Sequence, residues 1–226
     1  MMLKPISFLR KASGGGGGAV TSTFVDGVSA LTTDSATHTL DLSSVSSGDE
    51  LVMLCVKASG AQTTGMTALD LESVAMTLDG STSTTASRAK AYVFRGLCPA
   101  AAAGNATADF DGTMSGGNHW GVFVWKLSGT PTTETIASNQ YTNNTDPLIG
   151  DVSGVDGGTI MSVGIQEGGS GSFSWNVGTE RADFHYASTN DIVSCIDYAV
   201  TATGNVDIEG THGSTGHSAI ISLAVS

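Results

Sequence analysis

The chain has 226 residues, of which only 13 % are charged and 40 % are hydrophobic, so a sizeable core is available but the polar surface is largely uncharged. Its formal net charge of −12 repels phosphate groups, which argues against a nucleic-acid-binding protein. The sequence has no apolar run of about 20 residues, so we predict no membrane insertion.

The first eighteen residues join a short apolar and basic peptide to a run of glycines. The apolar stretch is too short for a secretory signal, which needs about 7–15 such residues, and too short for a lipid anchor. We therefore predict a docking arm over residues 1–19 that inserts into a larger assembly. A plain disordered terminus is the alternative. The predicted docking residues are Lys4, Pro5, Ile6, Phe8, Leu9, Arg10 and Lys11, and the linker residues are Gly14, Gly15, Gly16, Gly17 and Gly18.

Strand-like runs separated by turn residues fill the rest of the chain. No run of ten residues has a helical period, and the alanines at 100–103 offer one turn at most. Asp26-Gly27 and Asp79-Gly80 are predicted to be turns. The predicted strands are 20–25, 37–42, 50–56, 73–78, 89–94, 106–110, 119–127, 159–165, 172–177, 181–186, 191–200, 205–209 and 218–225.

This pattern predicts an all-β protein, a two-sheet antiparallel sandwich that is jelly-roll-like, with one head domain over residues 20–226. A boundary near 144–150 would instead divide the chain into two small domains.

The run 119–127 suits a strand that is buried on both faces, with Val122 and Val124 on one face and Phe123 and Trp125 on the other. Trp120 and Trp125 lie five residues apart and point to opposite faces. This leaves one of them available to solvent or to a neighbouring subunit.

The three cysteines cannot all pair, and none has the spacing of a zinc ligand. Cys55 and Cys195 lie in apolar runs and are predicted to be buried small hydrophobic residues, whereas Cys98 lies at a strand end. No disulfide framework follows, which is compatible with assembly in a reducing cytoplasm.

Two sets of residues have metal-binding side chains but lack a metal-binding pattern. Glu209, His212 and His217 lie within nine residues, yet the glycines between them predict a hydrophilic hairpin loop. Aspartates recur every five residues from Asp146 through Asp151 to Asp156, without an EF-hand or nonapeptide pattern, and are predicted to be solvated turn carboxylates. We therefore predict no metal and no cofactor.

Aromatic residues near the end of the chain suggest a ligand surface. In a strand His185 lies opposite Phe184 and Tyr186, and with Trp175 nearby an aromatic platform for a sugar is conceivable, although such rings more often fill a core. The candidate ligand-facing residues are Trp175, His185, Tyr186, His212 and His217.

The sequence has no nucleophile elbow, no recognisable Ser-His-Asp order and no nucleotide-binding glycine motif, so we predict that the protein is not an enzyme. Paired carboxylates for glycoside cleavage stay open, because the fold positions them.

The order of these motifs resembles β-sandwich accessory structural proteins of tailed bacteriophages and prophage-like clusters. The resemblance covers roughly residues 20–226. Its motifs are Gly48-Asp49-Glu50 before LVMLCVKA, AKAYVFRG, ATADFDG, GGNHWGVFVWKLSG, Gly157-Gly158-Thr159-Ile160 before MSVGIQ, Gly178-Thr179-Glu180-Arg181, and the final SAIISLAV.

The resemblance implies a virion protein at the virion surface: a tail-fibre or tail-tip receptor-binding component that is anchored by its arm and binds a host-surface glycan. A capsid decoration protein and a polysaccharide-degrading tail enzyme are the alternatives. The implied partners are other virion proteins and further copies of the chain, with a trimer as the expected oligomer.

Overall fold

The computed structural model describes residues 8–11, 19–32, 37–59, 68–82, 88–100, 104–110, 118–144, 148–168, 172–186, 191–213 and 215–226. The first-half strands are β1 (Phe8–Lys11), β2 (Thr21–Thr32), β3 (Thr37–Asp41), β4 (Glu50–Ser59), β5 (Leu69–Leu71), β6 (Val74–Ser81), β7 (Ala89–Leu97), β8 (Asn105–Phe110) and β9 (Asn118–Ser128). The second-half strands are β10 (Thr133–Asn144), β11 (Leu148–Ile149), β12 (Val152–Gly154), β13 (Thr159–Gln166), β14 (Ser174–Trp175), β15 (Thr179–Tyr186), β16 (Asp191–Ala199), β17 (Gly204–Val206), β18 (Glu209–Thr211) and β19 (Gly216–Val225). No helix in these residues is long and apolar enough to cross a membrane.

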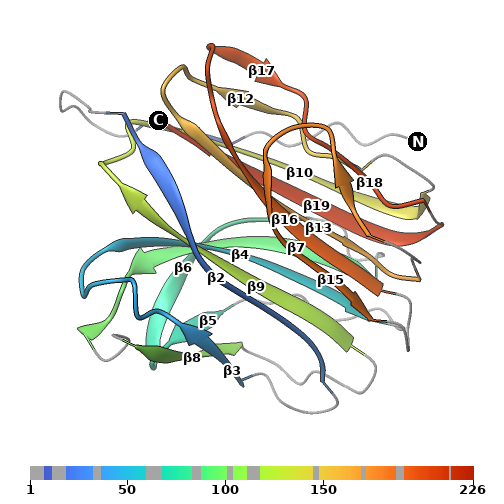
Figure 1. Cartoon of the computed structure of the whole chain (residues 1–226), viewed down its shortest axis with the longest axis horizontal. Coiled ribbons are helices and arrows are strands. Elements are labelled where there is room, and N and C mark those ends of the chain that lie inside the picture. Colours follow the sequence, from blue (N-terminus) through green and yellow to red (C-terminus); the bar gives the residue numbers. More distant parts are fainter. Residues whose placement is uncertain are drawn as a thin grey trace.

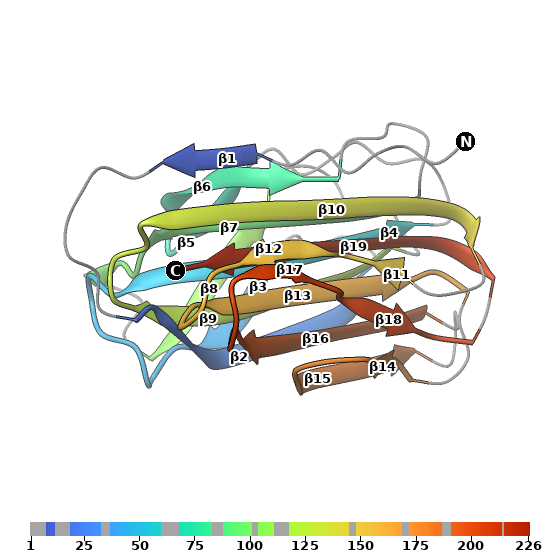
Figure 2. The same ribbon diagram turned by 90° about the horizontal axis from the view of Figure 1, so that it is seen from above.

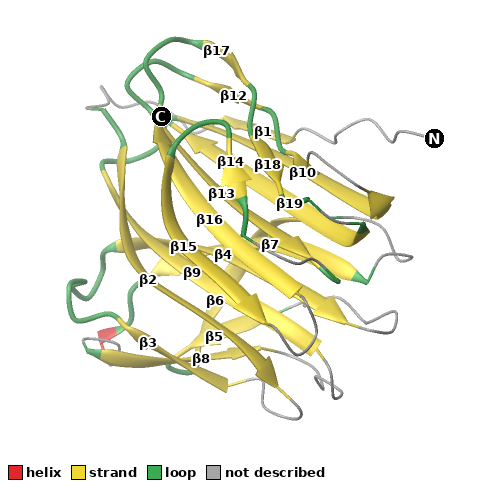
Figure 3. Cartoon of the chain, turned by 45° about the vertical axis from the view of Figure 1, so that its right-hand side comes forward, coloured by secondary structure: helices red, strands yellow, loops and turns green. Residues whose placement is uncertain are grey.

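The predicted all-β sandwich is confirmed. One large sheet has the order β1-β10-β19-β13-β16-β15, and the other has the order β2-β9-β4-β7-β6-β5-β8-β3. Their strands run antiparallel, and the two sheets lie face to face (Figures 1 and 2). Figure 3 shows strands throughout both layers.

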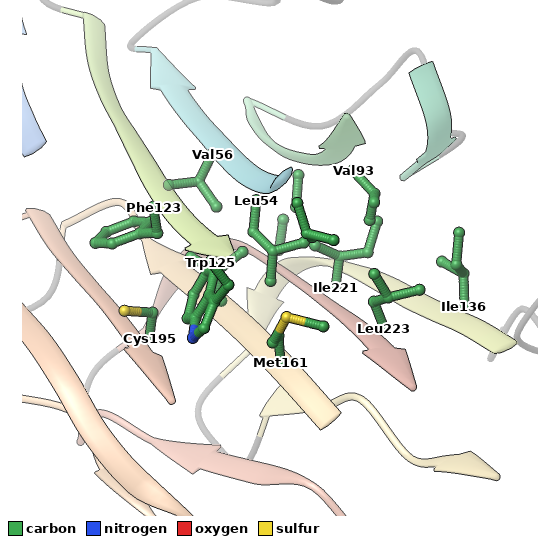
Figure 4. Close-up of a cluster of buried hydrophobic side chains, with 14 of the residues drawn as sticks. Leu54, Val56, Val93, Phe123, Trp125, Ile136, Met161, Cys195, Ile221 and Leu223 are labelled. Carbon is green, nitrogen blue, oxygen red and sulfur yellow. The ribbon is translucent and has the colours of Figure 1, made fainter. Parts of the chain in front are cut away.

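Three hydrophobic cores stabilise this arrangement. The central core lies between the two large sheets; Figure 4 shows Leu54 and Phe123 from one sheet facing Met161 and Ile221 from the other. A second core fills the space between the far face of β4, β7 and β9 and the strands β3, β5 and β8. The third lies between the six-stranded sheet and the short strands β11, β12, β14, β17 and β18. The sandwich is therefore covered on both outer sides.

Strand β9 shows the effect of this layering most clearly. Val122 and Val124 belong to the second core and Phe123 and Trp125 to the central core, so the predicted alternation is confirmed. Trp120 also lies in the second core, opposite Trp125. Both tryptophans are at most 1 % exposed, so the prediction that one of them is available to solvent or a neighbour is wrong within this chain.

The two halves of the chain build their sheets in the same order. The inner part of the first half is β2-β9-β4-β7-β6, and the second half has β10-β19-β13-β16-β15. Counted along the chain from β2 and from β10, these are corresponding strands of each half once β12 and β17, which form a separate two-stranded sheet, are left out of the count. The blue-to-green first half and the yellow-to-red second half lie in separate layers of Figure 1.

Two predicted turns are instead β-bulges within continuous strands. The register of β2 shifts between Phe24 and Asp26, and that of β6 shifts between Leu78 and Gly80. The extra residue is Asp79 in β6 and Val25, directly before the Asp-Gly pair, in β2, so both strands continue past the pair. The sequence also failed to indicate β10, because its segment TETIASNQYTNN is mostly polar.

The N-terminal arm is described only at Phe8–Lys11, where its backbone pairs with β10 and forms the edge strand of the six-stranded sheet. Lys4, Pro5, Ile6 and the glycine linker Gly14–Gly18 lie outside the described residues. The predicted free thiols are confirmed: Cys55, Cys98 and Cys195 are all buried and unpaired with one another.

Candidate functional site: an aromatic and acidic face on β14 to β16

A stacked pair of aromatic rings lies in the third core, on the outer side of the six-stranded sheet, where Phe173 is buried and Trp175 is half-buried. The ring centroids of Phe173 and Trp175 are 5.5 Å apart with an interplanar angle of 18°. Two glycines, Gly164 of β13 and Gly210 of β18, pack against the rings: a Cβ atom on either would lie 3.2 Å from a carbon of Phe173 and 3.4 Å from one of Trp175. Larger residues at these two positions would push the rings outward.

A hydrogen-bond chain fixes the indole of Trp175. Its Nε1 donates to Oγ of Ser194 over 2.9 Å, and that hydroxyl lies 3.4 Å from Oε2 of Glu180. Ser194 is buried, whereas Trp175 is half-buried and Glu180 is exposed. The chain therefore runs from the aromatic pair to a carboxylate at the surface.

Three polar side chains of β15 share this outer face. Glu180, Asp183 and His185 are exposed and are the cross-strand partners of Ile196, Ser194 and Ile192 of β16. Cross-strand partners point to the same side of a sheet. Simple alternation would place Glu180 and Asp183 on opposite faces, but the register shift between Glu180 and Ala182 brings them to the same one.

The two carboxyl groups hold their protons more strongly than ordinary ones. Desolvation raises the pKa of Glu180, and the charge of Asp183 adds to that rise. Desolvation also raises the pKa of Asp183, against the opposing effects of the backbone N–H of Phe173 and of His185. The pKa of Glu180 therefore depends on the charge of Asp183, and Asp183 also accepts a hydrogen bond from the backbone next to the aromatic pair.

This face combines the groups that recognise a polyhydroxylated ligand. An aromatic ring offers apolar contact area at little conformational cost, and carboxylates accept hydrogen bonds from hydroxyl groups. The first half lacks the acidic groups: Leu78 and Ser81 pair with Phe94 and Tyr92 where Glu180 and Asp183 pair with Ile196 and Ser194. The face is thus a feature of the second half.

The structure brings together only some of the predicted ligand-facing residues. Trp175 and His185 lie on the outer side of the sheet. Tyr186 lies on the opposite face of β15, where its ring stacks on His119 with centroids 4.4 Å apart. His212 is 3 % exposed and packs edge-on against Phe173, so its predicted place in a hydrophilic loop is wrong. His217 is half-buried at the start of β19, and burial lowers its pKa.

No group of three His, Cys, Asp or Glu residues in the described part of the chain could hold a metal ion. Asp151 binds the backbone instead: its Oδ1 accepts from the N–H of Ile208 over 3.0 Å. Asp156 lies in a turn and is exposed, and Asp146 lies outside the described residues.

Sequence reasoning missed Phe173, Glu180 and Asp183 as site residues. Their proximity depends on the bulge in β15 and on the packing of β14, neither of which leaves a periodic signal. It also missed the buried contact between Nδ1 of His119 and Oδ2 of Asp191, which come from different sheets. Both of these side chains are almost fully buried, so this pair joins the sheets.

The fold and the site together define an all-β sandwich protein with an outer aromatic and acidic face. No family model, no curated protein and no solved structure matches the chain.

Proposed function

We propose that this chain is a non-enzymatic virion surface protein of a tailed bacteriophage, a tail-fibre or tail-tip receptor-binding component that adheres to a host-surface glycan. The observation that carries the proposal is the half-buried ring of Trp175, which stacks on the buried Phe173 beside the exposed carboxylates of Glu180 and Asp183. The uncovered part of the Trp175 ring would contact the apolar face of a sugar, and the carboxylates would accept hydrogen bonds from its hydroxyl groups.

The N-terminal arm would attach the head to other virion proteins. Part of it, Phe8–Lys11, pairs with β10, which would set the direction in which the preceding residues leave the head. Several copies, expected as a trimer, would present several glycan sites at once. Multivalent attachment converts weak individual contacts into stable adhesion.

The binding test uses the full-length chain, labelled and added to candidate host cells and to a panel of surface glycans. We expect saturable binding by the natural protein. Trp175→Ala should weaken it at least tenfold, because the stacking surface is lost. Trp175→Phe keeps a ring and should bind within about threefold of the natural protein. Asp183→Asn should weaken binding, whereas Asp156→Asn, which removes an exposed carboxylate in a distant turn, should not.

The outcomes separate the competing functions. Binding that is unchanged in Trp175→Ala would refute this site as the adhesive surface. Binding to phage capsids in place of cells would favour a capsid decoration protein. Release of shortened sugars, lost in Asp183→Asn, would favour a polysaccharide-degrading enzyme, since the two carboxyl groups with raised pKa values could then act as acid and base.

A further inference from the structure

Each half of the chain has a hydrophobic core of its own, between its large-sheet strands and its outer strands. The second core takes all its residues from the first half, and the third core takes all of its residues from the second half. The outer strands follow one order as well: β5-β8-β3 in the first half and β14-β18-β11 in the second. Among the described strands, only β1 pairs with a strand of the other half.

The correspondence extends to single residues. Asp79 lies at the bulge of β6 and faces Arg95 of β7, with 3.7 Å between Oδ2 and Nε. Arg181 lies at the matching bulge of β15, and its Nε is 2.8 Å from Oδ2 of Asp197 of β16. In the strand register Arg95 lies opposite Val52 of β4, and Asp197 lies opposite Met161 of β13. Arg95 and Asp197 therefore occupy equivalent positions in the two halves. The two halves thus hold the same ion pair at the same place with its charges exchanged.

The central core is the surface along which these halves meet. Equivalent positions are apolar in both halves. Leu54 of β4 lies opposite Phe123 of β9, and at the corresponding place Val163 of β13 lies opposite Ile221 of β19. Rings from both halves meet there, since the centroids of Phe123 on β9 and Phe184 on β15 are 6.1 Å apart.

Polar contacts surround this apolar centre. Nε1 of Trp125 donates to Oδ2 of Asp197 over 3.2 Å, and the hydroxyl groups of Ser22 and Thr159 lie 2.7 Å apart. Arg95 also contacts Glu134 of β10. An apolar centre with a polar rim is the organisation of an interface between subunits.

We infer that the chain is a covalent dimer of two equivalent units, 20–129 and 133–226, and that the central core is a subunit interface. The partner that fits the inner face of each unit is the other unit. The units are joined at residues 130–132, next to the exposed Gly129, and β1 reaches from the first unit to the edge of the second.

The test begins with a full-length chain that carries a protease site between Gly129 and Thr130. After cleavage, the pieces should co-elute in size-exclusion chromatography at the mass of the intact chain. The midpoint of thermal unfolding should depend more steeply on concentration after cleavage than before it. On dilution the pieces should separate and keep their β-sheet circular dichroism. Loss of that spectrum on separation, or precipitation on cleavage, would overturn the inference.

Two neighbouring isoleucines provide a matched control. Ile220 and Ile221 of β19 are both 0 % exposed, but Ile220 lies in the third core and Ile221 in the central core. In the cleaved protein, Ile221→Ala should raise the dissociation constant of the pieces at least tenfold. Ile220→Ala should change it less than threefold while lowering the thermal stability of the second unit. Equal effects of the two substitutions on the dissociation constant would refute separate units.

Discussion

Replacing Arg95 with Met should destabilise the fold more than any other loss of a single ion pair described above. The guanidinium lies among three carboxylates: Nη2 is 3.0 Å from Oε1 of Glu50, Nε is 3.7 Å from Oδ2 of Asp79, and Nη1 contacts Glu134. These come from three different strands, and the Arg95 side chain is only 12 % exposed. Methionine fills much of the same volume but leaves the acidic groups without their shared cation.

The expected magnitude follows from burial. Each attraction at about 4 Å is worth roughly 4 kcal/mol at an effective dielectric constant of about 20, and desolvation and repulsion among the carboxylates offset much of the sum. Removing one partner from a mostly buried ion pair costs about 3–5 kcal/mol. The pair of Arg88 and Glu167, 3.4 Å apart, supplies the control: the Arg88 side chain is 44 % exposed and that of Glu167 17 %, so Arg88→Met should cost less than Arg95→Met, about 1 kcal/mol.

Urea unfolding followed by tryptophan fluorescence measures both free energies. The double variant Arg95→Met/Glu134→Gln should recover part of the lost stability, since one of the uncompensated charges is then removed. A cost for Arg95→Met no greater than that for Arg88→Met would show that the cluster does not stabilise the junction of the two sheets.

Three further predictions concern the cores. Phe123→Ala should lower the free energy of unfolding by about 3–5 kcal/mol in urea titrations, because it empties part of the central core. Burial lowers the pKa of His38 from 6.5 to about 3, so the folded state resists its protonation and stability falls as the pH drops from 6.5 toward 3. His38→Gln should remove that part of the pH dependence, about 2 kcal/mol once the half-exposed position of the ring is allowed for. Thiol reagents should react with the native protein slowly and with three groups after unfolding, because all cysteines are buried; they are Cys55, Cys98 and Cys195.

Sequence periodicity predicted the strands whose two faces differ clearly or are both apolar. The alternation around Val122 and Phe123 located β9 and its two buried faces. Periodicity did not reveal β10, because Ile136 shares its inward face with the polar residues Ser138 and Gln140, while Ala137 and Tyr141 on the other face lie in or against the third core. It also read Asp79-Gly80 as an end of a strand, because a bulge and a turn use the same residues.

The candidate site was predictable only in part. Trp175 and His185 were selected for their chemistry, and the structure places both on the outer side of the sheet. Tyr186 was selected with them, although strand alternation alone sends it to the other face. The contribution of Glu180 depends on a one-residue shift in pairing, which is a property of the whole sheet and not of the local sequence.

Strand β9 lies between two cores and offers no side chain face to solvent, which has a consequence for variation of the sequence. Trp120 and Phe123 face different cores, yet both are nearly fully buried. In a library of random substitutions, changes should therefore be poorly tolerated at both the odd-numbered and the even-numbered positions of β9. On the exposed side of β15 most changes should be accepted. The binding surface can diversify on β15 while β9 stays fixed, so adaptation to a new ligand need not compete with folding.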